Sequence, residues 1–370
     1  MRRYLWVLVL AIWLEVVAVA ACGNASPQIR ANPVVRPYFP GEYSLVSSPT
    51  GGLLLFYIDV PAGEEAFPPS RAKELVWKLD GTDAKWYQVS NSSFEQPVIE
   101  DGATLDPAAH DDLLFGGTHL GTPHPLAETW LWNGRRWLHP LTTTVPDARI
   151  CPALAYDPAL HGVVMFGGVG LGNSEVNDTW IWNGTSWVKL PEAVVSKASG
   201  CPSMAYDASA HQLVLLTGES GITQTWIMAG SEVGNVKWVE VNGSEPPGGT
   251  IDASAAYDES SGTVVLAGGH STLESTPFAS VKGSSSTWTW NPGVRGTRNV
   301  GWFDQVSQAS LSVRSSAMVF GQPGPVIAWC GFLRRVVGIS VSGNVRKPSL
   351  FWQWNDQEWT RLPRYDIAVP

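Results

Sequence analysis

The sequence has little charge, few cysteines and, after its N-terminus, no long apolar run. Only 15% of its 370 residues are Asp, Glu, Lys or Arg, which argues against coiled coils, long exposed helices and disorder. The 24 basic residues are outnumbered by 33 acidic ones, so no nucleic-acid partner is expected. Four cysteines are too few for a scaffold held together by disulfides. No apolar stretch beyond the N-terminal segment is long enough to span a bilayer.

Tryptophan, glycine and proline are abundant instead, at 19, 37 and 27 residues. With 44% hydrophobic residues, the chain can bury a full core. Glycine and proline between short apolar runs are typical of strands joined by turns. We therefore predict an all-β protein with no helix after residue 22.

The N-terminus has the pattern of an export signal. Two arginines precede an apolar run over residues 4–21, and small residues lead to Cys22. This order is that of a secretory signal. The cysteine directly after two alanines resembles the lipobox of bacterial lipoproteins, in which the cysteine is acylated and becomes the mature N-terminus. A plain signal peptide with an incidental cysteine and an uncleaved anchor helix are the alternatives, and Glu15 inside the apolar run weakens every export interpretation.

The lipobox resemblance implies a signal peptide over residues 1–21 and a polar tether over residues 22–40. Acyl chains on Cys22 would then hold the protein on the extracytoplasmic side of a bacterial membrane, since each buried CH₂ contributes roughly 0.8 kcal/mol. The tether is rich in Pro, Asn and Ser.

The remaining chain is a sixfold repeat with a period of about 50 residues. The best-preserved copy has four apolar runs separated by turn residues, at Ala153–Asp157, Gly162–Gly168, Asp178–Gly184 and Trp187–Leu190. Such runs predict four antiparallel strands in each unit. The predicted units cover about residues 44–90, 97–141, 151–190, 201–241, 253–306 and 314–362. In the last unit we take Val326–Gly331 as the second strand.

A single four-stranded sheet would leave both faces apolar, whereas six sheets arranged radially bury those faces on one another. The period, a Gly-Gly doublet after the second strand and a Trp that opens the fourth strand resemble kelch repeats and the central domain of galactose oxidase, over about residues 41–365. We therefore expect a six-bladed β-propeller of four-stranded kelch-like blades. Sixteen of the 19 tryptophans fall in third and fourth strands, where we expect them to fill the seams between blades rather than bind a ligand.

Several polar residues recur at one point of the repeat, in the turn between the first and second strands. Because equivalent turns on neighbouring blades are too far apart to share one metal ion, we interpret these residues as turn formers. They are His110, His161, His211, Asp157, Asp207 and Asp258. We predict no metal ion and no cofactor.

The kelch resemblance implies that the loops between second and third strands, and those that enter each first strand, share one face around the channel mouth. This is the candidate ligand face, because binding residues usually lie in loops on a rigid frame. Ordinary solvated polarity is the alternative. The candidates are His119, His124, Asp147, Arg149, Glu219, Asp252, His270 and Arg314.

Enzyme signatures are weak. The copper site of galactose oxidases and the aspartate boxes of sialidases are both absent from the sequence. Sialic acid mutarotases are similar in architecture, and Glu219 and Arg149 could then perform acid–base chemistry. We assign no catalytic residue.

Cys151 and Cys201 stand 50 residues apart at the same phase of the repeat, at the start of first strands in neighbouring units. A disulfide between them is one possibility in an exported protein, although equivalent positions could exceed the Cα separation of about 7 Å that a bridge allows. Cys330 takes the place of a doublet glycine and is expected to be a buried thiol.

Together these features predict a monomeric, lipid-anchored propeller that binds a protein or carbohydrate ligand. An exported carbohydrate-active enzyme, and a scaffold of an envelope complex without a small ligand, are the alternatives.

Overall fold

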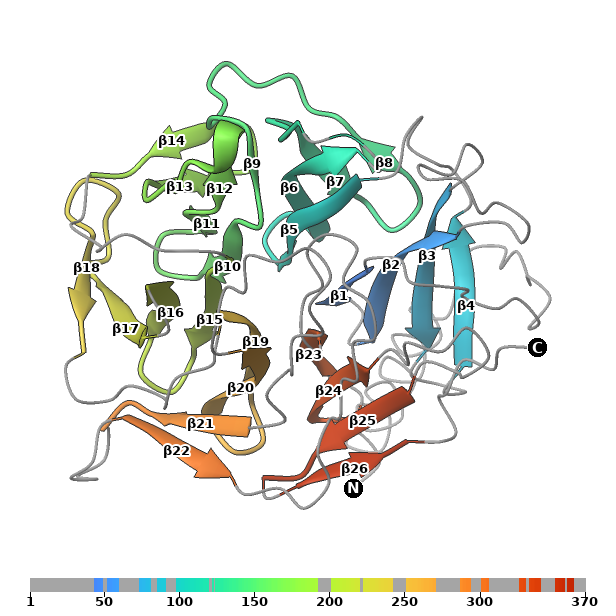
Figure 1. Ribbon diagram of the computed structural model, residues 1–370. Helices are drawn as coiled ribbons and strands as arrows, with labels where there is room; N and C mark the ends of the chain where they lie inside the picture. Colours follow the sequence, from blue (N-terminus) through green and yellow to red (C-terminus); the bar gives the residue numbers. More distant parts are fainter. Residues whose placement is uncertain are drawn as a thin grey trace, which may run out of the picture. The chain divides into compact units, whose positions relative to one another are not determined.

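The computed structural model contains six antiparallel sheets of four strands and one sheet of two strands (Figure 1). The residues that it describes are 43–48, 52–59, 73–80, 85–90, 98–119, 122, 124–191, 201–219, 222–241, 251–270, 287–293, 301–305, 326–330, 333–340, 350–356 and 358–362. The predicted signal peptide and tether lie outside these residues. Within the described part, no helix is both long and apolar enough to cross a membrane.

Each four-stranded sheet is one blade, built from a single stretch of chain. Blade 1 has β1 (Tyr43–Ser47), β2 (Leu53–Asp59), β3 (Lys73–Asp80) and β4 (Lys85–Ser90). Blade 2 has β5 (Val98–Asp106), β6 (Asp111–His119), β7 (Thr129–Trp132) and β8 (Trp137–Leu138). Blade 3 has β10 (Ala153–Asp157), β11 (Gly162–Phe166), β13 (Thr179–Trp182) and β14 (Trp187–Lys189).

The remaining blades follow the same order. Blade 4 has β15 (Ser203–Asp207), β16 (Gln212–Glu219), β17 (Ile222–Ala229) and β18 (Lys237–Glu240). Blade 5 has β19 (Ile251–Asp258), β20 (Thr263–His270), β21 (Thr287–Asn291) and β22 (Gly301–Gln305). Blade 6 has β23 (Val326–Cys330), β24 (Arg335–Ser340), β25 (Leu350–Trp354) and β26 (Trp359–Arg361). The first five sheets begin and end within three residues of the predicted units.

The first strands of the blades form a closed ring, which is the defining feature of a propeller. Strand β1 contacts β5, β5 contacts β10, and the series continues through β15, β19 and β23 back to β1. The blades therefore follow the chain around the ring, from blue to red in Figure 1. No strand is exchanged between blades 1 and 6, because each has four strands of its own. The predicted all-β, six-bladed fold is confirmed.

The strand assignment predicted for the last unit is wrong. Val326–Cys330 is the first strand of blade 6 and pairs with Arg335–Ser340, which is the second. The error arose because two short apolar runs follow each other and the turn between them lacks the usual aspartate. Arg334, with φ of 51°, occupies the left-handed turn position that histidines hold in other blades. Cys330 therefore stands opposite Arg335 in the ladder and does not replace a doublet glycine.

The recurring aspartates and histidines form turns, as predicted. Asp157 Oδ1 accepts hydrogen bonds from the backbone N–H groups of Ala159 at 2.8 Å and Leu160 at 3.2 Å. His161 closes this turn with φ of 52°. The aspartates and histidines at the equivalent points repeat the arrangement: Asp106 with His110 and Asp207 with His211. Asp258 caps an equivalent turn that Gly262 closes with φ of 72°.

The glycine doublet has a steric cause at Gly168. Its φ is 102°, which residues with a Cβ rarely adopt. A Cβ at this position would also lie 2.6 Å from the carbonyl oxygen of Ile150. The chain can therefore leave the second strand and pass the incoming segment only with glycine here.

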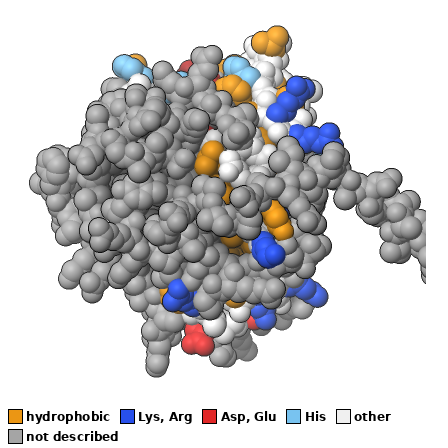
Figure 2. Space-filling view, turned by 90° about the vertical axis from the view of Figure 1, so that its right-hand side faces the viewer, with side chains coloured by type: hydrophobic (Ala, Val, Ile, Leu, Met, Phe, Trp, Pro, Cys, Tyr) orange, Lys and Arg blue, Asp and Glu red, His pale blue; other side chains and the backbone are white. Residues whose placement is uncertain are grey.

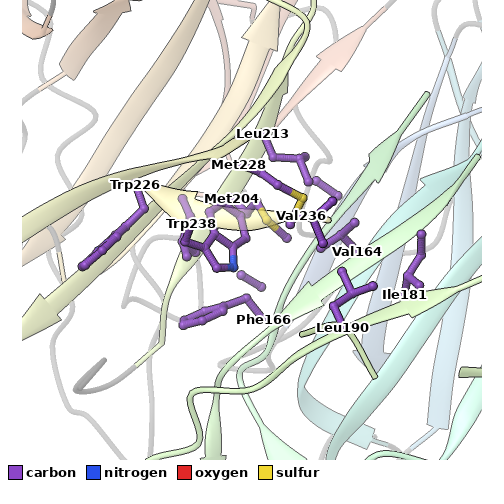
Figure 3. Close-up of a cluster of buried hydrophobic side chains, with 13 residues drawn as sticks. Val164, Phe166, Ile181, Leu190, Met204, Leu213, Trp226, Met228, Val236 and Trp238 are labelled. Carbon is purple, nitrogen blue, oxygen red and sulfur yellow. The ribbon is translucent and has the colours of Figure 1, made fainter. Parts of the chain in front are cut away.

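The tryptophans fill the seams between blades. In the seam between blades 3 and 4, Trp238 packs edge-to-face on Phe166 with ring centroids 5.9 Å apart, among buried side chains that include Met204 and Met228 (Figure 3). The indole of Trp238 also donates to Thr179 Oγ1 at 3.0 Å. Three further seams repeat this bond between a fourth-strand tryptophan and a third-strand threonine. The pairs are Trp187 with Thr129 at 2.9 Å, Trp302 with Thr225 at 2.9 Å and Trp359 with Thr287 at 2.7 Å.

Candidate functional site

The candidate ligand face lies at one end of the blades. His119, Glu219 and His270 each end a second strand, and their backbones stand opposite the beginning of a neighbouring strand in the same sheet. The fold thus brings these positions to equivalent places in blades 2, 4 and 5. The described side chains among the candidates are those of His119, His124, Asp147 and Arg149. The side chains of Glu219, Asp252 and His270, and the whole of Arg314, lie outside the described residues.

Arg149 is a structural residue rather than a ligand-binding one. It is fully buried, and its guanidinium forms an ion pair with Asp178, with Nη1 2.5 Å from Oδ1. The same guanidinium donates to the backbone oxygens of Asp147 at 2.9 Å and Gly167 at 3.1 Å. Burial raises the pKa of Asp178, but the hydrogen bond and charge of Arg149 outweigh it, so the pKa lies below its usual value. The guanidinium of Arg149, one of the candidate ligand-face residues, is thus paired within the fold.

The Arg149 ion pair holds a small extra sheet on blade 3. Strand β9 (Arg149–Ile150), which leads into the blade, pairs with β12 (Val169–Gly170) after the second strand. A 3₁₀ turn, η1 (Leu171–Asn173), follows β12. In blade 3, the loop that enters the first strand and the loop after the second strand are thus joined by hydrogen bonds. These are the two kinds of loop that were expected to share a face.

His124 lies exposed on a loop of blade 2 that hydrogen bonds hold in place. Thr118 Oγ1 donates to the backbone oxygens of Thr122 at 2.6 Å and His124 at 3.0 Å. The backbone N–H of Thr122 donates to His119 O at 2.9 Å. These bonds fix the loop and leave the imidazole of His124 in solvent, so a binding partner could reach it without rearranging the loop.

His119 differs, because it is half-buried. Its Nδ1 atom is buried and has no hydrogen-bond partner. The residue is paired across the sheet with Val98, the first residue of β5. A buried imidazole nitrogen without a partner is uncommon, since buried polar atoms in folded proteins are usually hydrogen-bonded.

Glu74, near the beginning of β3, is the most unusual acidic residue of the described part. Its side chain is only 3% exposed, and neither carboxylate oxygen has a hydrogen-bond partner. Burial raises the pKa of Glu74 well above its usual value, and the negative charge of Asp101 raises it further. The nearby backbone of Val98 offsets this only in part. Burial in the seam therefore disfavours the ionised form of Glu74.

Asp101 is the second member of this acidic pair and comes from β5 of the next blade. It is half-buried, and Ser44 Oγ of β1 donates to its Oδ2 at 3.3 Å. Burial raises the pKa of Asp101 to about 6, although hydrogen bonds from its own backbone and from Ser44 lower it in part. The seam between blades 1 and 2 thus holds two carboxyl groups whose pKa values are both raised by burial.

This pair can bind a polar ligand or exchange protons with one, because buried carboxyl groups with raised pKa values are suited to acid–base roles. No group of three His, Cys, Asp or Glu side chains suited to a metal ion occurs in the described part of the chain. The sequence analysis missed Glu74, Asp101 and Ser44. The available signal was the charge of Glu74 in the third strand of blade 1. The equivalent positions of blades 3 and 4 hold the uncharged residues Asn177 and Thr223.

Cys151 and Cys201 form a disulfide that joins blades 3 and 4. Their Cα atoms are 4.9 Å apart, which is within the range for a bridge. These two equivalent positions are therefore close enough for the bridge that the sequence left open. Cys22 and the side chain of Cys330 lie outside the described residues.

Taken together, the closed ring, the four-stranded blades and the seam tryptophans define a six-bladed β-propeller. No family model matches the chain, and no curated protein matches it. Solved structures do match, and one of them is the structure of YjhT, with a TM-score of 0.57 and 14% sequence identity. That match covers 90% of this chain and 99% of YjhT. At this identity the likeness shows the fold alone.

The charged side chains that Figure 2 shows are sparse on the face in view. Among the described atoms there, Lys and Arg side chains are scattered rather than gathered into one patch. The candidate site is defined by the buried carboxyl pair and its neighbours.

Proposed function

We propose that this protein is an exported propeller, held by a lipid on Cys22 to the extracytoplasmic side of a bacterial membrane, that binds a protein or glycan ligand on the face containing His119 and His124. The N-terminal pattern supports the anchor. The propeller fold supports the binding role, because it presents many loops on one rigid frame.

One observation carries the binding role: polar atoms on this face are buried without partners. Glu74 has two such oxygens and His119 has one such nitrogen. Leaving a buried polar group unpaired costs about 1–3 kcal/mol. A ligand that supplies the missing partners would recover this cost. Arg149, by contrast, is fully buried, and each of its three guanidinium nitrogens donates to a group of the fold.

The anchor is tested by expressing the full chain in a bacterium with radioactive palmitate. We expect label in the membrane-bound protein and loss of both label and membrane retention in Cys22→Ala. Cys330→Ala serves as the matched control and should keep the label. Unchanged mobility and membrane retention of Cys22→Ala would show that lipidation is wrong.

Ligand binding is tested with the full mature chain on a glycan array and by cross-linking in envelope extracts. We compare His124→Asn with His161→Asn, because both histidines are exposed but only His124 lies on the proposed face. Asparagine also tolerates the left-handed backbone at His161. We expect the His124 variant to lose captured ligand and the His161 variant to keep it. The proposal is contradicted if both variants lose ligand capture equally, or if the unaltered chain captures no molecule. The alternative function, a scaffold of an envelope complex, would then remain.

A carbohydrate-active enzyme is the second candidate, favoured by the raised pKa values of Glu74 and Asp101. Proton NMR of anomer exchange in sialic acid tests the mutarotase form, and copper analysis tests the oxidase form. Exchange that is abolished in Glu74→Gln would establish the enzyme. Arg149→Ala is not a suitable variant, because removing one partner of a buried ion pair damages folding.

A further inference from the structure

The carboxyl pair in the seam between blades 1 and 2 has no cationic partner among the described side chains. Glu74 has no side-chain hydrogen-bond partner, and the hydrogen bond to Asp101 from another side chain comes from the neutral hydroxyl of Ser44. Buried carboxylates in proteins are ordinarily paired with a cation or with several donors. This seam therefore has an excess of acceptors.

We propose that Glu74, Asp101 and Ser44 bind the primary ammonium group of a small ligand. This inference rests on the proposed function, because it names the chemical class of ligand that the binding face takes. The three residues come from β3, β5 and β1, so the site is made by two blades together.

The number and kind of groups fit an ammonium ion. An ammonium group has three N–H donors and no acceptor. The site offers three acceptors, namely two carboxyl groups and the lone pairs of the Ser44 hydroxyl, which itself donates to Asp101. Charge-assisted hydrogen bonds of this kind are roughly twice as strong as those between neutral groups.

Two of the three residues are partly exposed. Ser44 and Asp101 lie on the two innermost strands β1 and β5, which contact each other in the ring, and both are half-buried rather than sealed. Glu74 lies deeper, at 3% exposure. An ammonium group entering from the partly exposed side would meet Asp101 first and Glu74 last.

Other small cations fit less well. A Ca²⁺ ion takes about 6–8 oxygen ligands, and Mg²⁺ needs near-octahedral coordination. Two carboxyl groups and one hydroxyl supply too few, and the described residues contain no third acidic or imidazole group in a metal-binding arrangement with them. A neutral sugar hydroxyl would leave the buried negative charge uncompensated.

Binding of a cation should release a proton. The titratable and polar side chains that interact at the site are Glu74 on β3, Asp101 on β5 and Ser44 on β1. A cation favours the ionised form of a carboxyl group, so its binding lowers the pKa of Glu74, which burial raises in the empty site. Proton release upon binding is a result that a merely structural role for Glu74 would not produce.

The test is isothermal titration calorimetry of the full mature chain with D-glucosamine and D-glucose, which differ in one amine. At about pH 6.5 the Asp101 carboxyl is mainly ionised. We expect saturable binding of glucosamine, at least tenfold weaker binding of glucose, and heats that depend on the buffer because protons are released. Putrescine, an ammonium ligand without a sugar ring, is the second probe.

The variants Glu74→Gln and Asp101→Asn should each weaken glucosamine binding at least tenfold, and Glu74→Gln should also abolish the proton release. Asp111→Asn is the matched control, since Asp111 begins β6 at the other end of blade 2. Near-UV circular dichroism of the tryptophans checks that each variant is folded.

Three results would overturn this inference. They are equal binding of glucose and glucosamine, unchanged binding in both carboxyl variants, and no saturable heat with either glucosamine or putrescine. Ligand capture that depends on His124 would leave the proposed function standing in each case, so failure of the ammonium site is distinguishable from failure of the binding role.

Discussion

Four seams of the propeller are built alike, and the two seams of blade 1 are not. The four regular seams run from that between blades 2 and 3 to that between blades 5 and 6. Each buries a hydrogen bond from a fourth-strand tryptophan to a third-strand threonine. Blade 1 has Val76 at the threonine position, and blade 6, which precedes it in the ring, has Phe351. The repeated bond therefore stabilises the part of the ring that does not include blade 1.

The seam between blades 1 and 2 also differs from the regular seams in its charged residues. Besides Glu74 and Asp101, it contains Asp112 of β6, which is 1% exposed and stands opposite Trp132 in the sheet. Trp132 packs with Val76 of blade 1, and directly opposed residues of neighbouring strands point to the same face of a sheet, so Asp112 also faces blade 1. Val163 occupies the equivalent position in blade 3. Regularity thus marks the seams that hold the ring together, and departures from it mark the seam that we propose to bind a ligand.

The largest expected effect comes from removing a regular seam tryptophan. Trp187→Ala should lower the free energy of unfolding by about 3–5 kcal/mol, because the side chain is 1% exposed and its loss leaves a cavity. Trp86→Ala in blade 1 should cost clearly less, since Trp86 is only half-buried. Urea unfolding followed by tryptophan fluorescence measures both. Equal losses would mean that the seams do not differ in the way the structure indicates.

The second-largest expected effect is a gain in stability, from replacing the buried Asp112. Burial raises the pKa of Asp112 to about 8, and the charge of Asp111 adds to the rise. The folded state then binds more protons than the unfolded state between about pH 4 and pH 8, so the wild type loses stability as the pH rises through this window. Asp112→Val removes the loss and should stabilise the protein by about 2–4 kcal/mol at pH 7.

Unfolding measured at several pH values tests this expectation. The difference between Asp112→Val and the wild type should be small near pH 4 and grow towards pH 8. Asp147→Val is the control, because Asp147 is exposed, and it should change stability little. If Asp112→Val is instead less stable than the wild type, the Asp112 carboxylate must stabilise the seam between blades 1 and 2, which contradicts the prediction.

Sequence could reveal the regular seams because each blade imposes the same environment on the same position. Trp187, Asp157 and His161 recur for that reason, and their roles in packing and turns follow from the repeat. Glu74 and Asp101 occur once each and meet only when two blades pack, so no periodicity announces them. Arg149 misled the sequence analysis because its partner Asp178 lies 29 residues further along the chain.

The third prediction concerns the disulfide, which reinforces one regular seam. Replacing both cysteines, in Cys151→Ser with Cys201→Ser, should lower the stability by about 2–4 kcal/mol, since the bridge closes a loop of 50 residues in the unfolded chain. A reducing agent should shift the wild type to the midpoint of the double variant and leave that variant unchanged. A wild type that does not respond to the reducing agent, while thiol counting shows free cysteines, would contradict the bridge.

The smallest effect tests the hydrogen bond that distinguishes the two kinds of seam. Thr129→Val keeps the shape of the side chain but removes the acceptor of the Trp187 indole, so a buried N–H loses its partner. We expect a loss of about 1–3 kcal/mol. Thr179→Val should repeat the loss in the next seam, while the exposed Thr360→Val should not.

A double-mutant cycle separates the bond from the loss of the hydroxyl itself. Trp187→Phe removes the donor, so Thr129→Val in that background should cost little, because no unpaired indole N–H remains. If Thr129→Val costs as much in the Trp187→Phe background as in the wild type, the threonines act through packing alone. Blade 1, with Val76 at this position, would then be no weaker than its neighbours, and its seam would owe its difference to the carboxyl groups only.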